Sequence, residues 1–135
     1  MARLQVVAVA ARLPAWAETA CAEYARRMPK GYEVERLALK DERRLAAALP
    51  KGLRLIALDE RGRELTTAQF AKLLETPSAF LIGGAEGLSA AAKREAQMTL
   101  RLSAMTLPHA LAQVLLLEQL YRAATFLTGH PYHRA

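Results

Sequence analysis

The sequence predicts a single three-layer α/β domain, in which a parallel sheet is covered by helices on both faces. Short apolar runs alternate with helix-like stretches along the chain, and Gly or Pro residues separate most of them. The length of 135 residues suits one domain, and a hydrophobic fraction of 53% is enough for one sizeable core. We find no internal repeat or low-complexity linker. One domain over residues 1–135 is therefore expected.

Five short segments have the pattern of β-strands. The first, third and fourth are apolar runs of the kind that a parallel sheet buries on both faces, whereas the second alternates polar and apolar side chains. The fifth is a short run that follows a helix-like stretch. In chain order, the expected strands are residues 4–10, 32–39, 53–59, 79–82 and 99–102.

A segment with helical character follows each expected strand. Pro14 begins the first helix, and Ala and Leu dominate the second. Thr66 and Ser89 can cap the third and fourth helices, and Pro108 marks the start of the fifth. The expected helices are residues 14–28, 41–49, 66–75, 89–97 and a long segment after Pro108.

The final helix carries apolar residues on two faces. One sheet can bury only one of these faces, so a second covering surface is needed. The alternative is a helix buried within one protomer, but a chain this small has few fully enclosed positions. A twofold partner is the simplest cover, and we expect a homodimer. The two faces are Leu111, Val114 and Leu115, and Leu116, Leu120, Ala123 and Leu127.

Composition indicates a soluble protein and leaves open whether it has a polyanionic partner. Lys and Arg outnumber Asp and Glu by 19 to 13, which favours RNA, although a charge of +6 also suits a soluble protein without such a partner. Cys21 is the only cysteine, which excludes an intrachain disulfide and indicates a packed side chain in a reducing compartment. The N-terminal apolar run suits a strand better than a signal peptide, and no membrane span is expected. We expect a cytoplasmic protein.

The segment LIGGAEGL at residues 81–88 is the first candidate for a ligand site. It joins a strand to a helix start, where open α/β sheets bind ligands, but it lacks the patterns of the P-loop and of the dinucleotide fingerprint. A tight turn explains the glycines equally well. Glu86 lies in this loop and can accept a hydrogen bond from a ligand, although exposed carboxylates are common in turns.

The loop LSAMTL at residues 102–107 is the second candidate. Its backbone groups can bond the edges of an adenine, its apolar side chains can cover the faces, and it carries no charge, which suits adenosine better than phosphate. His109 follows at the helix start, where the protonated imidazole is disfavoured. We expect His109 to be a structural hydrogen-bonding residue.

The C-terminal GHPYHRA is the third candidate, because it combines three groups that RNA chemistry uses. Tyr132 can stack on a base, His133 can accept a proton near neutral pH, and Arg134 can contact phosphate. The chain's histidines also raise the possibility of a metal site, but no carboxylate or cysteine completes one. We expect no metal.

Three segments carry a family resemblance: LQVVAVAARLPAW with EYARRMPK, LIGGAEGL, and the run from LSAMTLPHAL through EQLYRAATFLTGHPYHR. With LIALDERG they cover most of the chain. Through them the sequence resembles the bacterial 23S rRNA pseudouridine-N3 methyltransferases of the SPOUT superfamily. The resemblance implies a deep C-terminal trefoil knot that binds S-adenosylmethionine, and a homodimer whose active sites span its interface. It also implies methylation of a pseudouridine in helix 69 of 23S rRNA on the ribosome.

The resemblance also implies residue roles. In the tail, Tyr132, His133 and Arg134 would receive the target nucleotide, and His133 is the candidate base for the N3 proton. In the alternative, the tail only shapes the pocket and solvent takes the proton. The implied cofactor-binding residues are Leu58, Gly83, Leu102, Ser103, Ala104, Met105, Thr106 and Leu107.

The sequence departs from these relatives at two places. Gln113 stands where relatives have Arg, which would remove an RNA-facing charge, and the segment at residues 40–52 is shorter. Two other functions stay open. A SPOUT methyltransferase for another RNA, such as tRNA, would keep the cofactor loops but not this tail, and a non-catalytic ribosome-binding protein would need no adenosine pocket.

Overall fold

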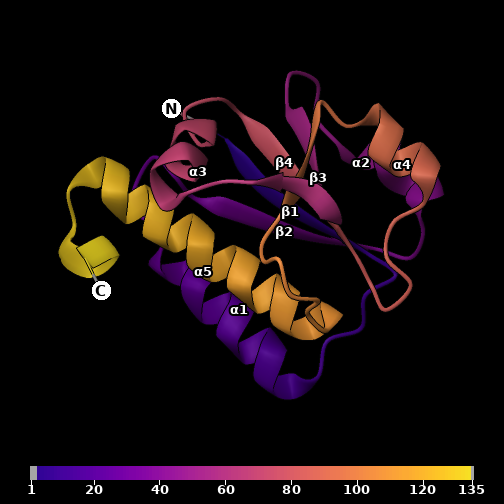
Figure 1. The fold of residues 1–135 in the computed structure, drawn as a ribbon, viewed down its shortest axis with the longest axis horizontal. Helices are drawn as coiled ribbons and strands as arrows, with labels where there is room; N and C mark the ends of the chain where they lie inside the picture. The colour runs from indigo at the N-terminus through magenta and orange to yellow at the C-terminus, as the bar shows by residue number, and fades with distance from the viewer. Residues whose placement is uncertain (1–2, 135) are drawn as a thin grey trace.

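The computed structural model describes residues 3–134, with side chains through Tyr132, and contains one five-stranded parallel sheet (Figure 1). The strand order is β2-β1-β4-β3-β5, and every neighbouring pair is parallel. This confirms the predicted parallel α/β sheet. The strands are β1 (Leu4–Val9), β2 (Val34–Leu39), β3 (Arg54–Glu64), β4 (Ser78–Gly83) and β5 (Met98–Arg101).

The helices begin largely where the capping residues predict. Thr66 forms a capping box with Gln69, Ser89 accepts a hydrogen bond from the backbone of Ala92, and Gly129 ends the last helix in the left-handed conformation. The helices are α1 (Ala15–Arg27), α2 (Leu45–Ala48), α3 (Thr67–Leu73), α4 (Ala90–Glu95) and α5 (His109–Thr128). Short 3₁₀ helices, η1 (Glu42–Arg44) and η2 (Pro131–Arg134), precede α2 and follow α5.

Side chains from both faces of the sheet are buried, which gives the predicted three layers. In β1, Leu4, Val6 and Ala8 pack into a cluster with α1, α3 and α5, whereas Val7 and Val9 pack into a second cluster with α2 and α4. Successive side chains of a strand point to opposite faces, so the central strands are apolar throughout. Figure 1 shows α1 and α5 side by side, with α2 and α4 away from them.

Two elements differ from the sequence prediction. The helix expected over residues 41–49 is a 3₁₀ turn followed by the four-residue α2, and Leu49 is already extended (ψ 127°) because the residue before a proline disfavours the α conformation. The strand expected to end at residue 59 continues to Glu64, because Arg63 and Glu64 pair with β5 after a register shift that follows Leu58. A local apolar pattern cannot predict this second pairing.

The two apolar faces of α5 are covered to different extents. Leu116, Leu120 and Ala123 are fully buried against the sheet, whereas Leu111 is 37% exposed and Leu115 is half-buried. The protomer therefore covers one predicted face and leaves part of the other open.

Among the helices of residues 3–134, none is long and apolar enough to cross a membrane. Cys21 is buried, as predicted, and burial raises the pKa of its thiol.

Candidate functional site

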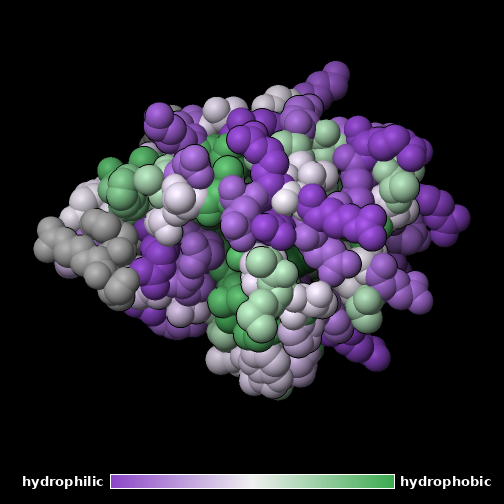
Figure 2. Space-filling model, in the orientation of Figure 1, coloured by the Kyte–Doolittle hydropathy of each residue, from purple (hydrophilic) through white to green (hydrophobic). Residues whose placement is uncertain are grey.

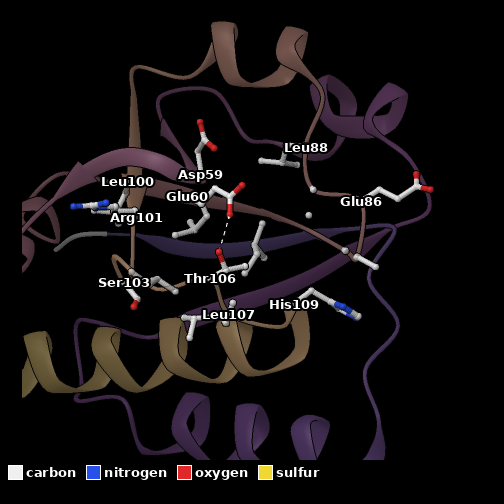
Figure 3. Close-up of a pocket in the computed structure, with 18 of the residues that line it drawn as sticks. Asp59, Glu60, Glu86, Leu88, Leu100, Arg101, Ser103, Thr106, Leu107 and His109 are labelled. Carbon is white, nitrogen blue, oxygen red and sulfur yellow. Dashed lines mark hydrogen bonds between the residues drawn. The ribbon is translucent and has the colours of Figure 1, made fainter.

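A cavity of about 320 Å³ lies at the carboxyl ends of β4 and β5 and beside the middle of β3 (Figure 3). Its walls are residues Leu58 to Glu60 of β3, the glycine loop after β4, and the loop that joins β5 to α5. The carboxyl ends of adjacent parallel strands are the usual place for ligands in open α/β sheets. The two loops that the sequence singled out, residues 81–88 and 102–107, thus share one cavity.

 

Seven of the eight residues expected to bind a cofactor line this cavity. Ala104 is exposed and is not among the lining residues, although both of its neighbours in the chain are. The loop turns at this point, where the backbone N–H of Met105 donates to Oγ of Ser103 at 2.9 Å. The seven lining residues are Leu58, Gly83, Leu102, Ser103, Met105, Thr106 and Leu107.

The glycines shape the cavity wall by close backbone packing. A Cβ on Gly83 would lie 2.6 Å from the carbonyl carbon of Gly87, within the same loop. A Cβ on Gly84 would overlap the carbonyl oxygen of Ala10, which follows β1 with a positive φ of 53°. The tight turn expected from the glycines and the ligand cavity are therefore the same structure.

Two carboxylates at the cavity were missed by the sequence analysis. Asp59 lies 3.3 Å from Nζ of Lys93, and Oε2 of Glu60 accepts a hydrogen bond from the Thr106 hydroxyl at 3.4 Å (Figure 3). Lys93 offsets the charge of Asp59, but no ion pair to Glu60 occurs in the described part of the chain. The cavity therefore favours a ligand with a positive group. Their place shortly after the buried residues Leu55 to Ala57 of β3 was the available signal.

Two other candidates are at the rim. Glu86 is exposed, and its carboxylate points away from the cavity (Figure 3). His109 lines the cavity, and its Nε2 lies 3.3 Å from the carbonyl oxygen of Arg12. This contact joins the start of α5 to the loop after β1, which agrees with a structural role for His109.

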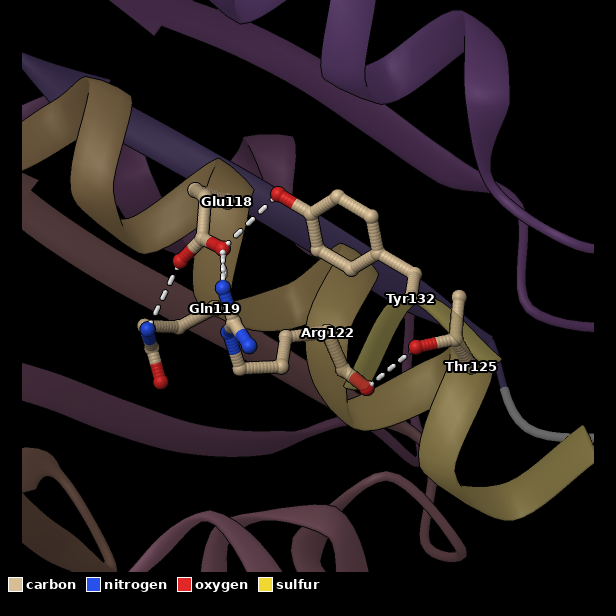
Figure 4. A network of polar contacts seen from close by, with 5 residues as sticks. All are labelled: Glu118, Gln119, Arg122, Thr125 and Tyr132. Carbon is tan, nitrogen blue, oxygen red and sulfur yellow. Dashed lines mark hydrogen bonds and ion pairs between the residues drawn. The ribbon is translucent and has the colours of Figure 1, made fainter. Parts of the chain in front are cut away.

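The tail folds back onto α5 through Tyr132 (Figure 4). The Tyr132 hydroxyl donates to Oε2 of Glu118 at 3.0 Å, and the same carboxylate oxygen accepts from Arg122 at 2.8 Å. The Tyr132 ring also packs edge-on against Tyr121, with the ring centroids 4.5 Å apart, and Arg122 lies over its face at 5.0 Å. Tyr132 is thus anchored to its own protomer.

The tail and the cavity lie at opposite ends of α5. His109 begins this helix at the cavity, and η2 follows its other end, 20 residues later. The Tyr132 hydroxyl reaches back as far as Glu118, which is nine residues after His109, or about 14 Å along the helix at 1.5 Å per residue, and Tyr132 does not line the cavity. Within one protomer, Tyr132 and the cofactor loops do not form one site. The side chains of His133 and Arg134 lie outside the part that the structure describes.

Tyr132→Phe should lower the free energy of unfolding by about 1 kcal/mol at pH 7, because Glu118 loses a hydrogen bond. Burial, and then the Tyr24 hydroxyl and the Glu118 carboxylate, raise the pKa of Tyr132 above its usual value. The stability from this raised pKa is fully present below about pH 10 and is lost as the pH rises further. Urea unfolding of both proteins at pH 7 and pH 11 checks this, and an unchanged difference at pH 11 would contradict it.

Two further observations concern metals and Gln113. Among the side chains that the structure describes, which end at Tyr132, no group of three His, Cys, Asp or Glu residues is placed to hold a metal ion. Gln113 is only 3% exposed, and its Oε1 has no hydrogen-bond partner among the described residues. In this protomer the Gln113 side chain therefore lies in the interior and not on the surface.

The comparisons with known proteins agree with this fold. A family model described as "Predicted SPOUT methyltransferase" matches residues 2–133. The ribosomal RNA large subunit methyltransferase H of Polynucleobacter asymbioticus is 48% identical, over 98% of this chain and 99% of the relative. The protein of the same name from Methylibium petroleiphilum is 47% identical over the same shares.

A solved structure shows the same fold at lower identity. The SpoU methyltransferase AviRb from Streptomyces viridochromogenes, in complex with the cofactor AdoMet, superposes with a TM-score of 0.58 at 19% identity. The match covers 89% of this chain and 57% of that one. The sequence relatives therefore indicate the family, and this structure indicates the shared fold.

Proposed function

Because this chain belongs to the SPOUT methyltransferase family, we propose that it methylates N3 of a pseudouridine in helix 69 of 23S rRNA on the ribosome, using S-adenosylmethionine. The observation that carries the proposal is the single cavity formed by Leu58, the glycine loop and the LSAMTL loop. The relatives named as large-subunit rRNA methyltransferases match over nearly their whole length. This substrate would place the activity in the cytoplasm.

The residues of the cavity fit S-adenosylmethionine. Leu58, Leu102 and Leu107 offer apolar surface to an adenine, and the backbone beside Gly83 offers polar groups to its edge. The carboxylate of Glu60, which lacks an ion-pair partner in the described structure, suits a positively charged ligand. When bound, S-adenosylmethionine supplies a methyl group activated by a sulfonium charge.

The residues of the chain would contribute mainly by positioning. The cavity loops would hold the cofactor, exclude water and align it with the ring nitrogen of the nucleotide. The N3 proton of pseudouridine must leave, and His133 is the proposed base. The competing account assigns only a shaping role to the tail and gives the proton to solvent.

His133→Ala should lower turnover about 10²-fold or more while cofactor affinity stays unchanged, because only proton transfer is removed. Single-turnover methylation and equilibrium binding of S-adenosylmethionine measure the two effects separately. His130→Ala, three residues earlier in the same tail, is the control. Near-normal turnover of His133→Ala would instead assign the proton to solvent.

A homodimer with active sites across its interface is part of the proposal. The tail follows the end of α5 opposite to the cavity, and Tyr132 does not line the cavity of its own protomer, so a role of the tail in catalysis would use the cavity of another copy. Leu111 and Met105 are exposed by 37% and 78%. Figure 2 shows hydrophobic side chains gathered over α5 and the loop before it, between hydrophilic ones. This surface is the proposed contact.

The proposal also includes a trefoil knot, supported by the way β3 meets β5. Leu58 and Arg63 both pair with Leu100, so residues 59–62 leave β5 and return to the same point. A Cβ on Gly62 would lie 2.6 Å from the backbone nitrogen of Leu100. The proposed knot would lie beside this close contact, in the loop that follows β5.

The test is to incubate the protein and radiolabelled S-adenosylmethionine with ribosomes from cells that lack this activity, and to map the label. We expect label at N3 of a helix 69 pseudouridine. Label on another RNA, such as tRNA, would keep the enzyme class and change the substrate. Ribosome binding without label or cofactor binding would favour a non-catalytic ribosome-binding protein.

A further inference from the structure

We infer that a groove between α3 and β5 binds the phosphate backbone of RNA, an inference that rests on the proposed function. The groove has a volume of about 390 Å³ and is separate from the cofactor cavity, with which it shares no lining residue. Arg54, Arg63 and Lys72 line it, together with two glutamines and three apolar side chains.

The three cations of the groove are not neutralised by the protein. Among the described residues, no carboxylate forms an ion pair with Arg54, Arg63 or Lys72, and none lines the groove. Glu64 is next to Arg63 in the chain, but its carboxylate lies 3.4 Å from Arg101. The positive charge of the groove is therefore available to bind an external anion.

The two glutamines add donors, and the oxygen of each amide already accepts a backbone hydrogen bond. Oε1 of Gln69 accepts from the backbone N–H of Thr66 at 2.9 Å, and Oε1 of Gln97 accepts from that of Leu55 at 2.7 Å. A backbone N–H requires an oxygen acceptor, so each amide orientation is determined by its partner. Both side-chain NH₂ groups remain as donors. A groove with cations and donors suits phosphate oxygens.

Arg54 gives the groove a fixed cation. One nitrogen of its guanidinium donates to the carbonyl oxygen of Leu73 at 2.8 Å and lies 3.3 Å from Oγ of Ser78. These contacts hold the partly buried side chain without cancelling its charge. Arg63 and Lys72 are exposed, so they can adjust to a ligand that Arg54 helps to place.

The position of the groove favours RNA over other anions. Met98 lines the groove and Arg101 lines the cofactor cavity, three residues apart in β5, or about 10 Å at 3.3 Å per residue. An RNA strand along β5 would contact both. The groove would then bind backbone phosphates beside the target nucleotide and set its register without reading its base.

The test compares Arg63→Gln/Lys72→Gln with Arg26→Gln/Arg43→Gln, a control that removes the same charge at exposed, ion-paired positions. Binding to ribosomes is measured over a series of salt concentrations. The groove variant should bind about 10-fold more weakly at low salt, and the slope of log affinity against log salt should fall by about 1 to 2. Arg63→Lys/Lys72→Arg should restore both values.

A groove variant with the affinity and salt slope of the control would overturn the inference. The thermal midpoint and the cofactor affinity of each variant show that the fold and the cavity are intact. If the wild-type protein binds ribosomes but transfers no labelled methyl group, the proposed activity is wrong. The salt slopes of the groove variant and the control then still test whether the groove binds RNA. If the wild type does not bind ribosomes, both proposals are overturned.

Discussion

Gly62→Ala should lower the free energy of unfolding by about 3 kcal/mol or more, among the largest effects of a single methyl group in this protein. The added Cβ would lie 2.6 Å from the nitrogen of Leu100 and 2.7 Å from the carbonyl carbon of Thr99. Both are backbone atoms of β5, so no side chain can move aside. Urea unfolding measures the loss.

Gly52→Ala is the matched control, because it separates backbone strain from steric overlap. Gly52 has a φ of +90°, but a Cβ there would meet no atom within 4 Å. Alanine at this position should cost about 1 kcal/mol through its left-handed conformation alone. If Gly62→Ala lowered the free energy of unfolding no more than Gly52→Ala does, the close approach of β3 and β5 at Gly62 would be contradicted.

The order of the strands and helices could be predicted because their signals are local. Val6 to Val9 is apolar on both faces of one strand, and Thr66 caps its helix through residues next to it in the chain. The second pairing of β3 with β5 depends on contacts between residues almost 40 positions apart, such as Arg63 and Leu100. No periodicity in either segment indicates that contact.

The candidate site was predictable to the extent that loops at the ends of parallel strands converge. This rule brings Leu58, Gly83 and Thr106 together, and the structure confirms that they line one cavity. It does not show which side chains turn inward. Ala104 is exposed outside the cavity, whereas Glu60 reaches Thr106 from β3. The groove at Arg63 and Lys72 also required the fold, because β3 and α3 supply one cation each.

A composite active site predicts that two inactive variants complement each other. Thr106→Arg places a long cation at an exposed position of the cavity wall, opposite Glu60, and should abolish cofactor binding. His133→Ala/Arg134→Ala removes the proposed tail groups and should leave the cavity intact. Each homodimer should retain about 1% of wild-type turnover or less.

A mixed dimer of these variants, purified through a different affinity tag on each protomer, should recover about half of the wild-type turnover. Its one complete site combines the cavity of the tail variant with the tail of the cavity variant. If each protomer used its own tail, neither site of the mixed dimer would be complete and turnover would stay near 1%. Recovery would therefore show that the tail acts across the interface, since α5 separates it from the cavity of its own protomer.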